Sequence, residues 1–152
     1  MYPIFSTKSV VFGGTDEYVT MGDVLDFDYD EALTISCWFK TSTSGSEYLV
    51  SKREGASNYR GYGLLVKGNV SGEIEFMVCS VLSTAEANVR TTSTGWNDGR
   101  WHHLVGVYTG SGTAAGLLIY IDGVAQSTST QSDTLGTGTT VNSASFNLSL
   151  IH

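Results

Sequence analysis

The chain has 152 residues, of which 41% are hydrophobic and only 15% are charged. This length predicts one domain with a single core, covering residues 1–152, and no apolar run is long enough to cross a bilayer. The net charge of −7 at pH 7 argues against nucleic acid as the main partner, because phosphate binding needs clustered basic residues and only Lys52 and Arg53 are adjacent. Eighteen glycines and eight tyrosines are typical of short strands joined by tight turns.

Alternation of polar and apolar residues predicts about ten or eleven short strands. The clearest is Leu33–Thr41, in which the apolar residues occupy the odd-numbered positions. No stretch longer than ten residues has the apolar period of a helix, and Ser83–Asn88 allows one helical turn at most. The pattern predicts an all-β fold of two packed antiparallel sheets, with strands at 9–12, 18–21, 33–41, 48–51, 63–67, 73–81, 89–92, 101–108, 117–121, 126–129 and 144–151.

The cysteines and the turn residues add local detail. Cys37 and Cys79 lie inside predicted strands and not at a CxxC spacing, which excludes a zinc knuckle and predicts two buried, unreactive thiols. Asn97–Gly99 and Asp122–Gly123 are predicted tight turns whose glycines take positive φ. Residues 109–116 form a predicted hairpin connection, and 127–145 a Ser/Thr/Gly-rich loop or a poorly paired strand.

Four segments together resemble a known family. They are WNDGRWHHLVGVYTG at 96–110 with LLIYIDGV at 117–124, VVFGGTDEYVTMG at 10–22, LTISCWFK at 33–40, and YLVSKR at 48–53. In this order they are similar to the laminin-G-like branch of the concanavalin A-like lectin/glucanase superfamily. The resemblance implies a jelly-roll sandwich of two antiparallel sheets, and a non-catalytic recognition module.

The chain departs from that family at two places. Gly13 stands where the family usually has an aspartate, and the sequence ends at His152, where family members continue through a further strand of the type G-x-I-D-E-V. We therefore expect a C-terminally truncated fragment that lacks about 20–30 residues. Loss of that strand would leave an open sheet edge near Ser9–Phe12, through which two copies of the chain tend to pair as a homo-oligomer.

Catalysis is disfavoured by the residues at the expected position. Glucanases of this superfamily carry two strand carboxylates in a pattern E-[IL]-D-x-x-E, whereas residues 73–78 read EIEFMV, with Val78 in place of the second catalytic acid. A retaining hydrolase needs two carboxyl groups about 5–5.5 Å apart. His102 and His103 alternate faces of one strand, which favours a structural histidine bonded to a neighbouring carboxylate or backbone group.

Calcium is the one cofactor that the sequence indicates. Asp16 and Glu17 form a candidate metal-facing pair, supported by the family's habit of binding calcium near this loop. The acidic run from Asp23 to Glu31 contains D-x-D-x-D, but it lacks the glycine and glutamate that an EF-hand loop requires. It is either a solvated acidic loop or a calcium site completed by backbone carbonyls.

Exposed aromatic residues in loops indicate where a sugar would bind, because pyranose C–H faces stack on aromatic rings. The predicted ligand-binding residues are Asn58, Tyr59, Arg60, Tyr62 and Trp96. Trp38 lies on the face opposite to Cys37, either on a concave sheet surface or in the core.

These observations predict a non-catalytic recognition module, carbohydrate-binding or adhesive, whose partner is a carbohydrate or another protein. Such modules belong to larger extracellular, cell-surface or phage-virion proteins, although no signal peptide is visible at Met1. The alternative is a structural or protein–protein interaction domain without a sugar site. A glycoside hydrolase is the third and least favoured function.

Overall fold

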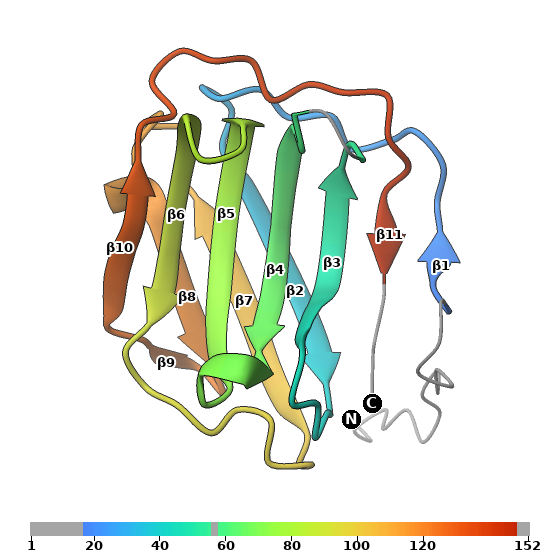
Figure 1. Ribbon diagram of the computed structural model, residues 1–152, viewed down its shortest axis with the longest axis vertical. Coiled ribbons are helices and arrows are strands. Elements are labelled where there is room, and N and C mark those ends of the chain that lie inside the picture. Colours follow the sequence, from blue (N-terminus) through green and yellow to red (C-terminus); the bar gives the residue numbers. More distant parts are fainter. Residues whose placement is uncertain (1–16, 56–57, 149–152) are drawn as a thin grey trace, which may run out of the picture.

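The computed structural model describes residues 17–55 and 58–148, which form two antiparallel sheets packed face to face (Figure 1). The all-β prediction of a two-sheet sandwich is confirmed. The larger sheet has the order β1-β11-β3-β4-β5-β6-β10, and the smaller has the order β2-β7-β8-β9. The strands are β1 (Val19–Thr20), β2 (Leu33–Phe39), β3 (Ser46–Arg53), β4 (Gly61–Lys67), β5 (Glu73–Val81), β6 (Ala85–Thr91), β7 (His102–Tyr108), β8 (Leu117–Ile121), β9 (Val124–Ala125), β10 (Thr128–Asp133) and β11 (Asn147–Leu148).

The predicted strands agree with the structure where alternation is strong. β5 and β8 have the predicted bounds, and β2 pairs with β7 in register from Leu33↔Tyr108 to Phe39↔His102. Residues 83–88, which allow one helical turn at most, form none: β6 begins at Ala85, four residues before the strand predicted at 89–92, and alternates inward apolar with outward polar side chains. The predicted strand at 9–12, and the open edge beside it, lie outside the described residues.

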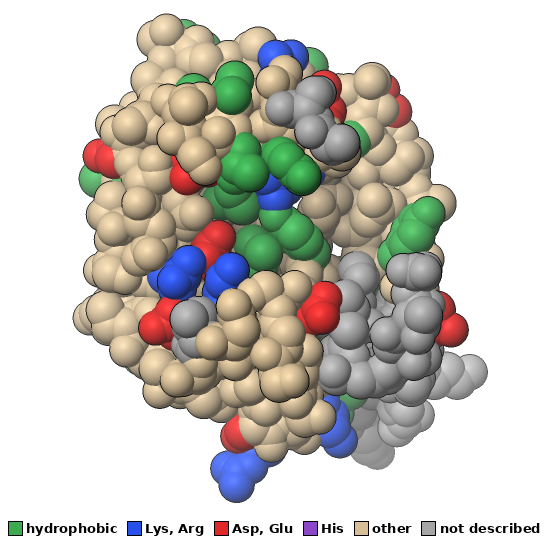
Figure 2. Space-filling view, viewed as in Figure 1, with side chains coloured by type: hydrophobic (Ala, Val, Ile, Leu, Met, Phe, Trp, Pro, Cys, Tyr) green, Lys and Arg blue, Asp and Glu red, His purple; other side chains and the backbone are tan. Residues whose placement is uncertain are grey.

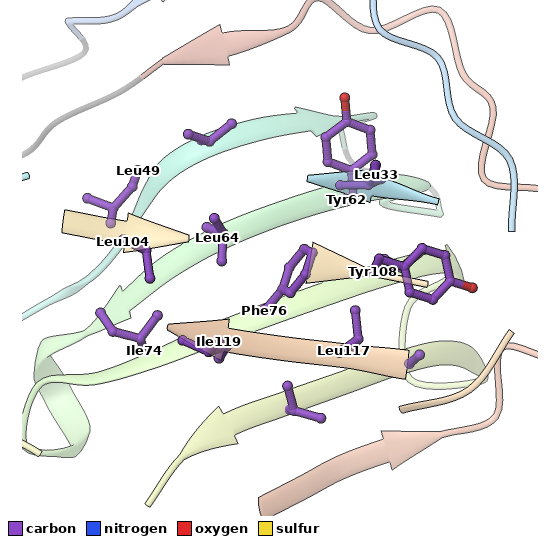
Figure 3. Close-up of a cluster of buried hydrophobic side chains, with 14 of the residues drawn as sticks. Leu33, Leu49, Tyr62, Leu64, Ile74, Phe76, Leu104, Tyr108, Leu117 and Ile119 are labelled. Carbon is purple, nitrogen blue, oxygen red and sulfur yellow. The ribbon is translucent and has the colours of Figure 1, made fainter. Parts of the chain in front are cut away.

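The core lies between the two sheets and is fully apolar at its centre (Figure 3). Leu64 and Phe76 of the larger sheet and Leu104 of the smaller one are completely buried. Gly106 of β7 allows this close approach, since a Cβ there would lie 3.1 Å from Leu64 and 3.2 Å from Phe76. Cys37 and Cys79 are both free, and Cys79 is buried as expected, whereas Cys37 is only half-buried. None of the described segments is a helix long and apolar enough to cross a membrane.

His102 joins the two turns that the sequence predicts. Its ring nitrogen Nδ1 lies 2.8 Å from Asp122 Oδ2, and Nε2 lies 3.2 Å from Asp98 Oδ1. Gly99 and Gly123 of these turns take the predicted positive φ of 76° and 79°. Asp122 also accepts a hydrogen bond of 2.8 Å from the His103 backbone N–H. The prediction of a structural histidine held by carboxylates is confirmed.

A buried lysine holds the other end of the sandwich together. Lys52 of β3 points toward the core and is fully buried. The residues on either side of it, Ser51 and Arg53, point to the outer face. Its Nζ lies 2.8 Å from Asp23 Oδ1 and 3.1 Å from Asp26 Oδ1, and donates to the Ala144 carbonyl at 2.7 Å. These contacts attach two long connections, 21–32 and 134–146, which run along the same end of the sandwich (Figure 1).

We expect Lys52→Met to lower the free energy of unfolding by about 3 kcal/mol, because it leaves two carboxylates and a carbonyl without their cation. For a domain of this size the melting temperature falls by roughly 6–12 °C. Thermal unfolding followed by circular dichroism measures this shift. The matched control is Lys40→Met, which changes an exposed lysine and should stay within about 0.5 kcal/mol of wild type. Equal melting temperatures for the two variants would contradict the role of Lys52.

The His102 contacts predict a specific acid sensitivity. The Arg100 backbone N–H and the His102 ring hold the pKa of Asp98 below its usual 3.8, and the His102 ring and His103 backbone N–H do the same for Asp122. A carboxylate with a lowered folded pKa stabilises the fold above its unfolded pKa, and that contribution is lost as pH falls through the folded pKa. The free energy of unfolding should therefore decline below about pH 4.

Asp122→Asn tests this sensitivity directly. The variant should be less stable than wild type at neutral pH, because the amide cannot accept charge-assisted hydrogen bonds from His102 and His103. Its stability should also change less on acidification. Urea denaturation at neutral pH and near pH 3 measures both effects. An acid dependence as steep as that of wild type would show that Asp122 is not one of the responsible groups.

Candidate functional site

The outer face of the seven-stranded sheet is hollowed, and Figure 2 shows hydrophobic side chains gathered in this hollow, with a basic side chain among them and further charged ones beside them. Because β3, β4, β5 and β6 are paired in register, their outward-facing residues form rows across the sheet. One row runs from Arg53 through Gly61 and Cys79 to Glu86. The next runs from Ser51 through Gly63 and Met77 to Asn88. We use "the hollow" for the space bounded by Tyr48, Arg53, Leu65, Met77, Cys79, Glu86 and Asn88.

The hollow exists because β4, the central strand, lacks side chains where the two rows cross it. Gly61 and Gly63 face outward, whereas Tyr62 between them faces the core. The ring of Tyr48 lies over Gly63, since a Cβ at Gly63 would be 2.8 Å from Tyr48 Cε1. Gly61 has φ of +126° and its Cβ would overlap the Lys52 carbonyl, so only glycine fits there.

The floor of the hollow is apolar. Leu65, Met77 and Cys79 form a small cluster with Tyr48 on the outer face, separate from the main core. The exposed fractions of Met77 and Cys79 are only 3% and 0%, which is low for residues that face away from the core. Burial raises the pKa of the Cys79 thiol to about 11, so this sulfur stays protonated at neutral pH and acts as an apolar surface.

One wall of the hollow is a hydrogen-bonded polar network on β5 and β6. Arg90 donates to Glu75 Oε2 from Nη2 at 2.7 Å and from Nε at 3.0 Å, and Asn88 Nδ2 donates to Glu75 Oε1 at 3.2 Å. These bonds fix the Asn88 amide, yet its Oδ1 is buried without a hydrogen-bond partner among the described residues, as is Glu86 Oε2. An unpaired buried polar group costs about 1–3 kcal/mol, and a binding site is one physical reason for keeping it.

The opposite wall carries a cation between two tyrosines. The Arg53 guanidinium lies 5.3 Å from the Tyr48 ring centroid and 5.2 Å from that of Tyr59. Its Nε donates to the Tyr59 carbonyl at 3.1 Å, while Nη2 is buried with no partner in the described part of the chain. Burial lowers the pKa of Arg53, although an arginine keeps its charge at neutral pH.

Three of the predicted ligand-binding residues lie at the rim of this hollow. Tyr59 is 39% exposed and takes a left-handed backbone with φ of 56°, an uncommon conformation for an aromatic residue. Asn58 accepts hydrogen bonds through its carbonyl from Leu82 N at 2.9 Å and from Cys79 Sγ at 3.9 Å. Arg60 Nε is buried without a hydrogen-bond partner in the described structure.

The other two predicted residues do not offer a free ring to a ligand. Tyr62 is 2% exposed, because it shares the inward phase of β4 with Leu64, and its hydroxyl donates to the Leu25 carbonyl at 2.7 Å. Trp96 lies at the opposite end of the sheet, where its backbone N–H bonds the Gly72 carbonyl. Its ring is half-buried against the core and meets His102 edge to face, with centroids 5.1 Å apart.

The predicted metal residues remain without a structural test. Asp16 lies outside the described residues and Glu17 is exposed next to it, so a calcium site at this pair stays a prediction. Within residues 17–55 and 58–148, no three His, Cys, Asp or Glu side chains are grouped to hold a metal ion. In the acidic run, Asp23 and Asp26 bind Lys52, and Asp28 accepts the backbone N–H groups of Tyr29 and Thr140.

The smaller sheet has a different outer face. Trp38 is 61% exposed and stacks on His103 at 5.0 Å between ring centroids, and His103 Nε2 lies 2.8 Å from Ser36 Oγ. Trp38 therefore belongs to the surface and not to the core. Trp101, two residues before His103, is also exposed, at 47%. Among the described residues of this face, no arginine–carboxylate pair like Arg90–Glu75 is present.

Sequence reasoning missed most of the hollow, because its residues come from separate strands. In the sequence, Arg53 stands out only as the neighbour of Lys52 and the last residue of the YLVSKR segment, and Glu86 and Asn88 carry no motif and precede the strand predicted at 89–92. One local signal does exist. Outward positions of β4 carry Gly61, Gly63 and Leu65, and outward positions of β5 carry Met77 and Cys79, whereas polar residues are expected on a solvent-facing sheet surface.

A family model described as the concanavalin A-like lectin/glucanases superfamily matches residues 12–147. No curated protein matches the chain. Among solved structures, the chain is similar to the mouse laminin alpha1 chain, domains LG4-5, with a TM-score of 0.55 and 13% sequence identity. The likeness covers 86% of this chain but only 31% of the laminin chain, and at this identity it shows a common fold. This chain thus belongs to the laminin G-like branch of the concanavalin A-like lectin/glucanase superfamily.

Proposed function

We propose that this domain is a non-catalytic module that binds carbohydrate in the hollow of the seven-stranded sheet. One observation carries the proposal. Arg53 Nη2, Glu86 Oε2 and Asn88 Oδ1 are buried without partners around an apolar floor. Ligand sites combine an apolar surface with a few fixed polar groups, and this outer face has both. Sugars match that combination because their rings have apolar C–H faces edged by hydroxyl groups.

Tyr59 supplies the aromatic component of the proposed site. Its ring is 39% exposed at the rim and is held by the Arg53 guanidinium on one side. The hydrogen bond from Arg53 Nε to the Tyr59 carbonyl fixes the loop against β3. A ring that is positioned before binding loses little conformational freedom when a sugar stacks on it, and this favours affinity.

Catalysis is not part of the proposal. Laminin G-like domains are typically non-catalytic. Arg90 contacts both carboxylates of the EIE segment, with Nη2 2.7 Å from Glu75 Oε2 and Nε 3.6 Å from Glu73 Oε2. Val78, at the position of the second catalytic acid, is 1% exposed and faces the core. Hydrolysis needs an acid and a nucleophile that face the substrate, and this arrangement supports binding instead.

The family supports a proposal for the setting of the module. Laminin G-like domains are usually extracellular and generally mediate binding. We propose that this domain displays the hollow on a larger extracellular, cell-surface or phage-virion protein. A rigid sandwich with its ligand site on one broad face suits attachment to a glycan-covered surface.

We expect Tyr59→Ala to weaken binding to glycans by roughly two- to tenfold, because an aromatic stacking contact contributes roughly 0.5–1.5 kcal/mol. The measurement is a glycan array on the wild-type chain, followed by titration of the strongest hits with each variant. Tyr18→Ala is the matched control, since Tyr18 is 59% exposed beside β1, at the edge of the same sheet. Absence of any glycan hit, or equal losses in both variants, would contradict the proposed function.

A protein-binding function is the second candidate, and the outer face of the smaller sheet favours it. Exposed aromatic side chains gathered on one sheet face are typical of interaction surfaces. Trp38→Ala discriminates between the two functions. Under carbohydrate binding in the hollow, this variant keeps wild-type glycan affinity. Loss of glycan affinity in Trp38→Ala with no loss in Tyr59→Ala would place the sugar on the smaller sheet and overturn the assignment to the hollow.

A further inference from the structure

The outer face of the smaller sheet is apolar at positions where a solvent-facing sheet is normally polar. Four of its side chains on β7 and β8 are Val105, Val107, Leu118 and Tyr120, and Leu118 is 41% exposed. β8 is apolar at its inward positions too, as is β7 from Leu104 to Tyr108. An antiparallel sheet with one face in water alternates apolar and polar residues, whereas strands that are apolar on both sides are typical of sheets covered on both faces. The pattern therefore indicates a face that another layer covers.

This face is also free of full charges, in a chain whose net charge is −7. In β2, β7 and β8, all of which the structure describes, no outward position holds Asp, Glu, Lys or Arg. Two of its polar side chains bond one another, since His103 Nε2 lies 2.8 Å from Ser36 Oγ. Removing water from such a face costs little, whereas two copies of the chain repel each other wherever they present their carboxylates. An apolar, uncharged partner fits this face, and a second copy of the same face meets that description.

The two ends of the face are complementary in shape. At one end, Trp38 is 61% exposed and stacks on His103, its partner across the strand pair. At the other end, the paired residues Thr34 and Val107 are much smaller than an indole ring. Val105 lies midway between the two ends. A second copy, turned by 180° about an axis that crosses the strands at Val105, would place its large ring over the small side chains of the first.

The charges just beyond the two ends match under the same rotation. Lys40 is exposed one residue after β2, whereas Asp30 and Glu31 are exposed on the connection before it. The other charges at the Lys40 end are compensated within the chain, because both carboxylates there contact His102 and Arg100 lies 3.5 Å from one of them. The rotation therefore brings Lys40 of each copy toward the acidic pair of the other. Such charges at the margin orient two partners more than they stabilise them.

We propose that the outer face of the smaller sheet binds a second copy of this chain, in a two-fold dimer whose facing β2 strands run antiparallel. Four short strands cover much less than the roughly 800 Å² per partner that a stable complex buries, so the dimer is weak, with a dissociation constant on the order of 10 µM. The inference names the partner of the protein-binding surface considered above. It is independent of carbohydrate binding in the hollow, which lies on the other sheet.

The first experiment measures the mass of the unmodified chain by sedimentation velocity between roughly 2 and 200 µM, a range that brackets the expected dissociation constant. The expected result is a shift from one chain to two as the concentration rises. A single chain at every concentration would overturn the inference, and the protein partner of this face would then be a different molecule. Glycan binding, titrated separately on the same sample, does not depend on either result.

Val105→Glu tests whether this face is the interface. The variant puts a carboxylate at the centre of a contact that excludes water, so the dimer should weaken at least about tenfold. Val81→Glu is the matched control, because it makes the same substitution at an exposed position of β5 in the other sheet. Trp38→Ala truncates an exposed ring without burying a charge and should weaken the dimer severalfold. A dimer that persists in both face variants would place the interface elsewhere, such as the sheet edge expected near Ser9–Phe12, and overturn the inference.

A pair of charge reversals tests the antiparallel arrangement. Lys40→Glu and Asp30→Lys should each dimerise severalfold more weakly than wild type at low salt, because each brings like charges together at both ends of the dimer. An equimolar mixture of the two variants should recover the wild-type affinity, since every contact between the two different chains then joins opposite charges. Weaker dimers that do not recover on mixing would contradict the proposed two-fold arrangement.

Discussion

The burial of a single ammonium group determines how one end of this sandwich closes. Lys52 takes an inward position on β3, where an apolar residue would normally lie, and it needs carboxylates and carbonyls to compensate its lost hydration. The connections 21–32 and 134–146 supply them. Since inward and outward positions alternate, the same constraint turns Arg53 to the outer face. The alternation of side chains along β3 therefore places both the buried Lys52 and the outward Arg53.

The hollow combines features that a structural surface does not require. Glycine at two outward positions of the central strand weakens a sheet, and unpaired polar atoms beside an apolar floor reduce stability. Such costs are typical of functional sites. The four-stranded sheet behind the hollow is regular, because β2, β7 and β8 pair over long registers without a break and pack against the apolar core. Rigid backing and unpaired polar atoms on the front face together support the proposed recognition function.

Much of the fold follows from the sequence, because a period of two is strong wherever one sheet face is buried. The strand Leu33–Phe39 and the turn at Asp122 are examples. Tyr62 shows where prediction failed. Its strand was expected to begin at Gly63, which left the tyrosine in a loop, whereas β4 begins at Gly61 and turns that ring inward. The walls of the hollow were beyond sequence reasoning, since Arg53 and Glu86 meet only through the pairing of four strands.

The bare backbone at Gly63 makes the shape of this sheet face sensitive to a single substitution. A methyl group there would sit 2.8 Å from Tyr48 Cε1 and 3.1 Å from the Val50 carbonyl oxygen, and of these two neighbours only the ring can move. The displaced phenol would give up the contact of its hydroxyl with Met77 Sδ, which is 3.7 Å long. One codon change, glycine to alanine, would therefore reshape the hollow while the architecture of the sandwich stays the same.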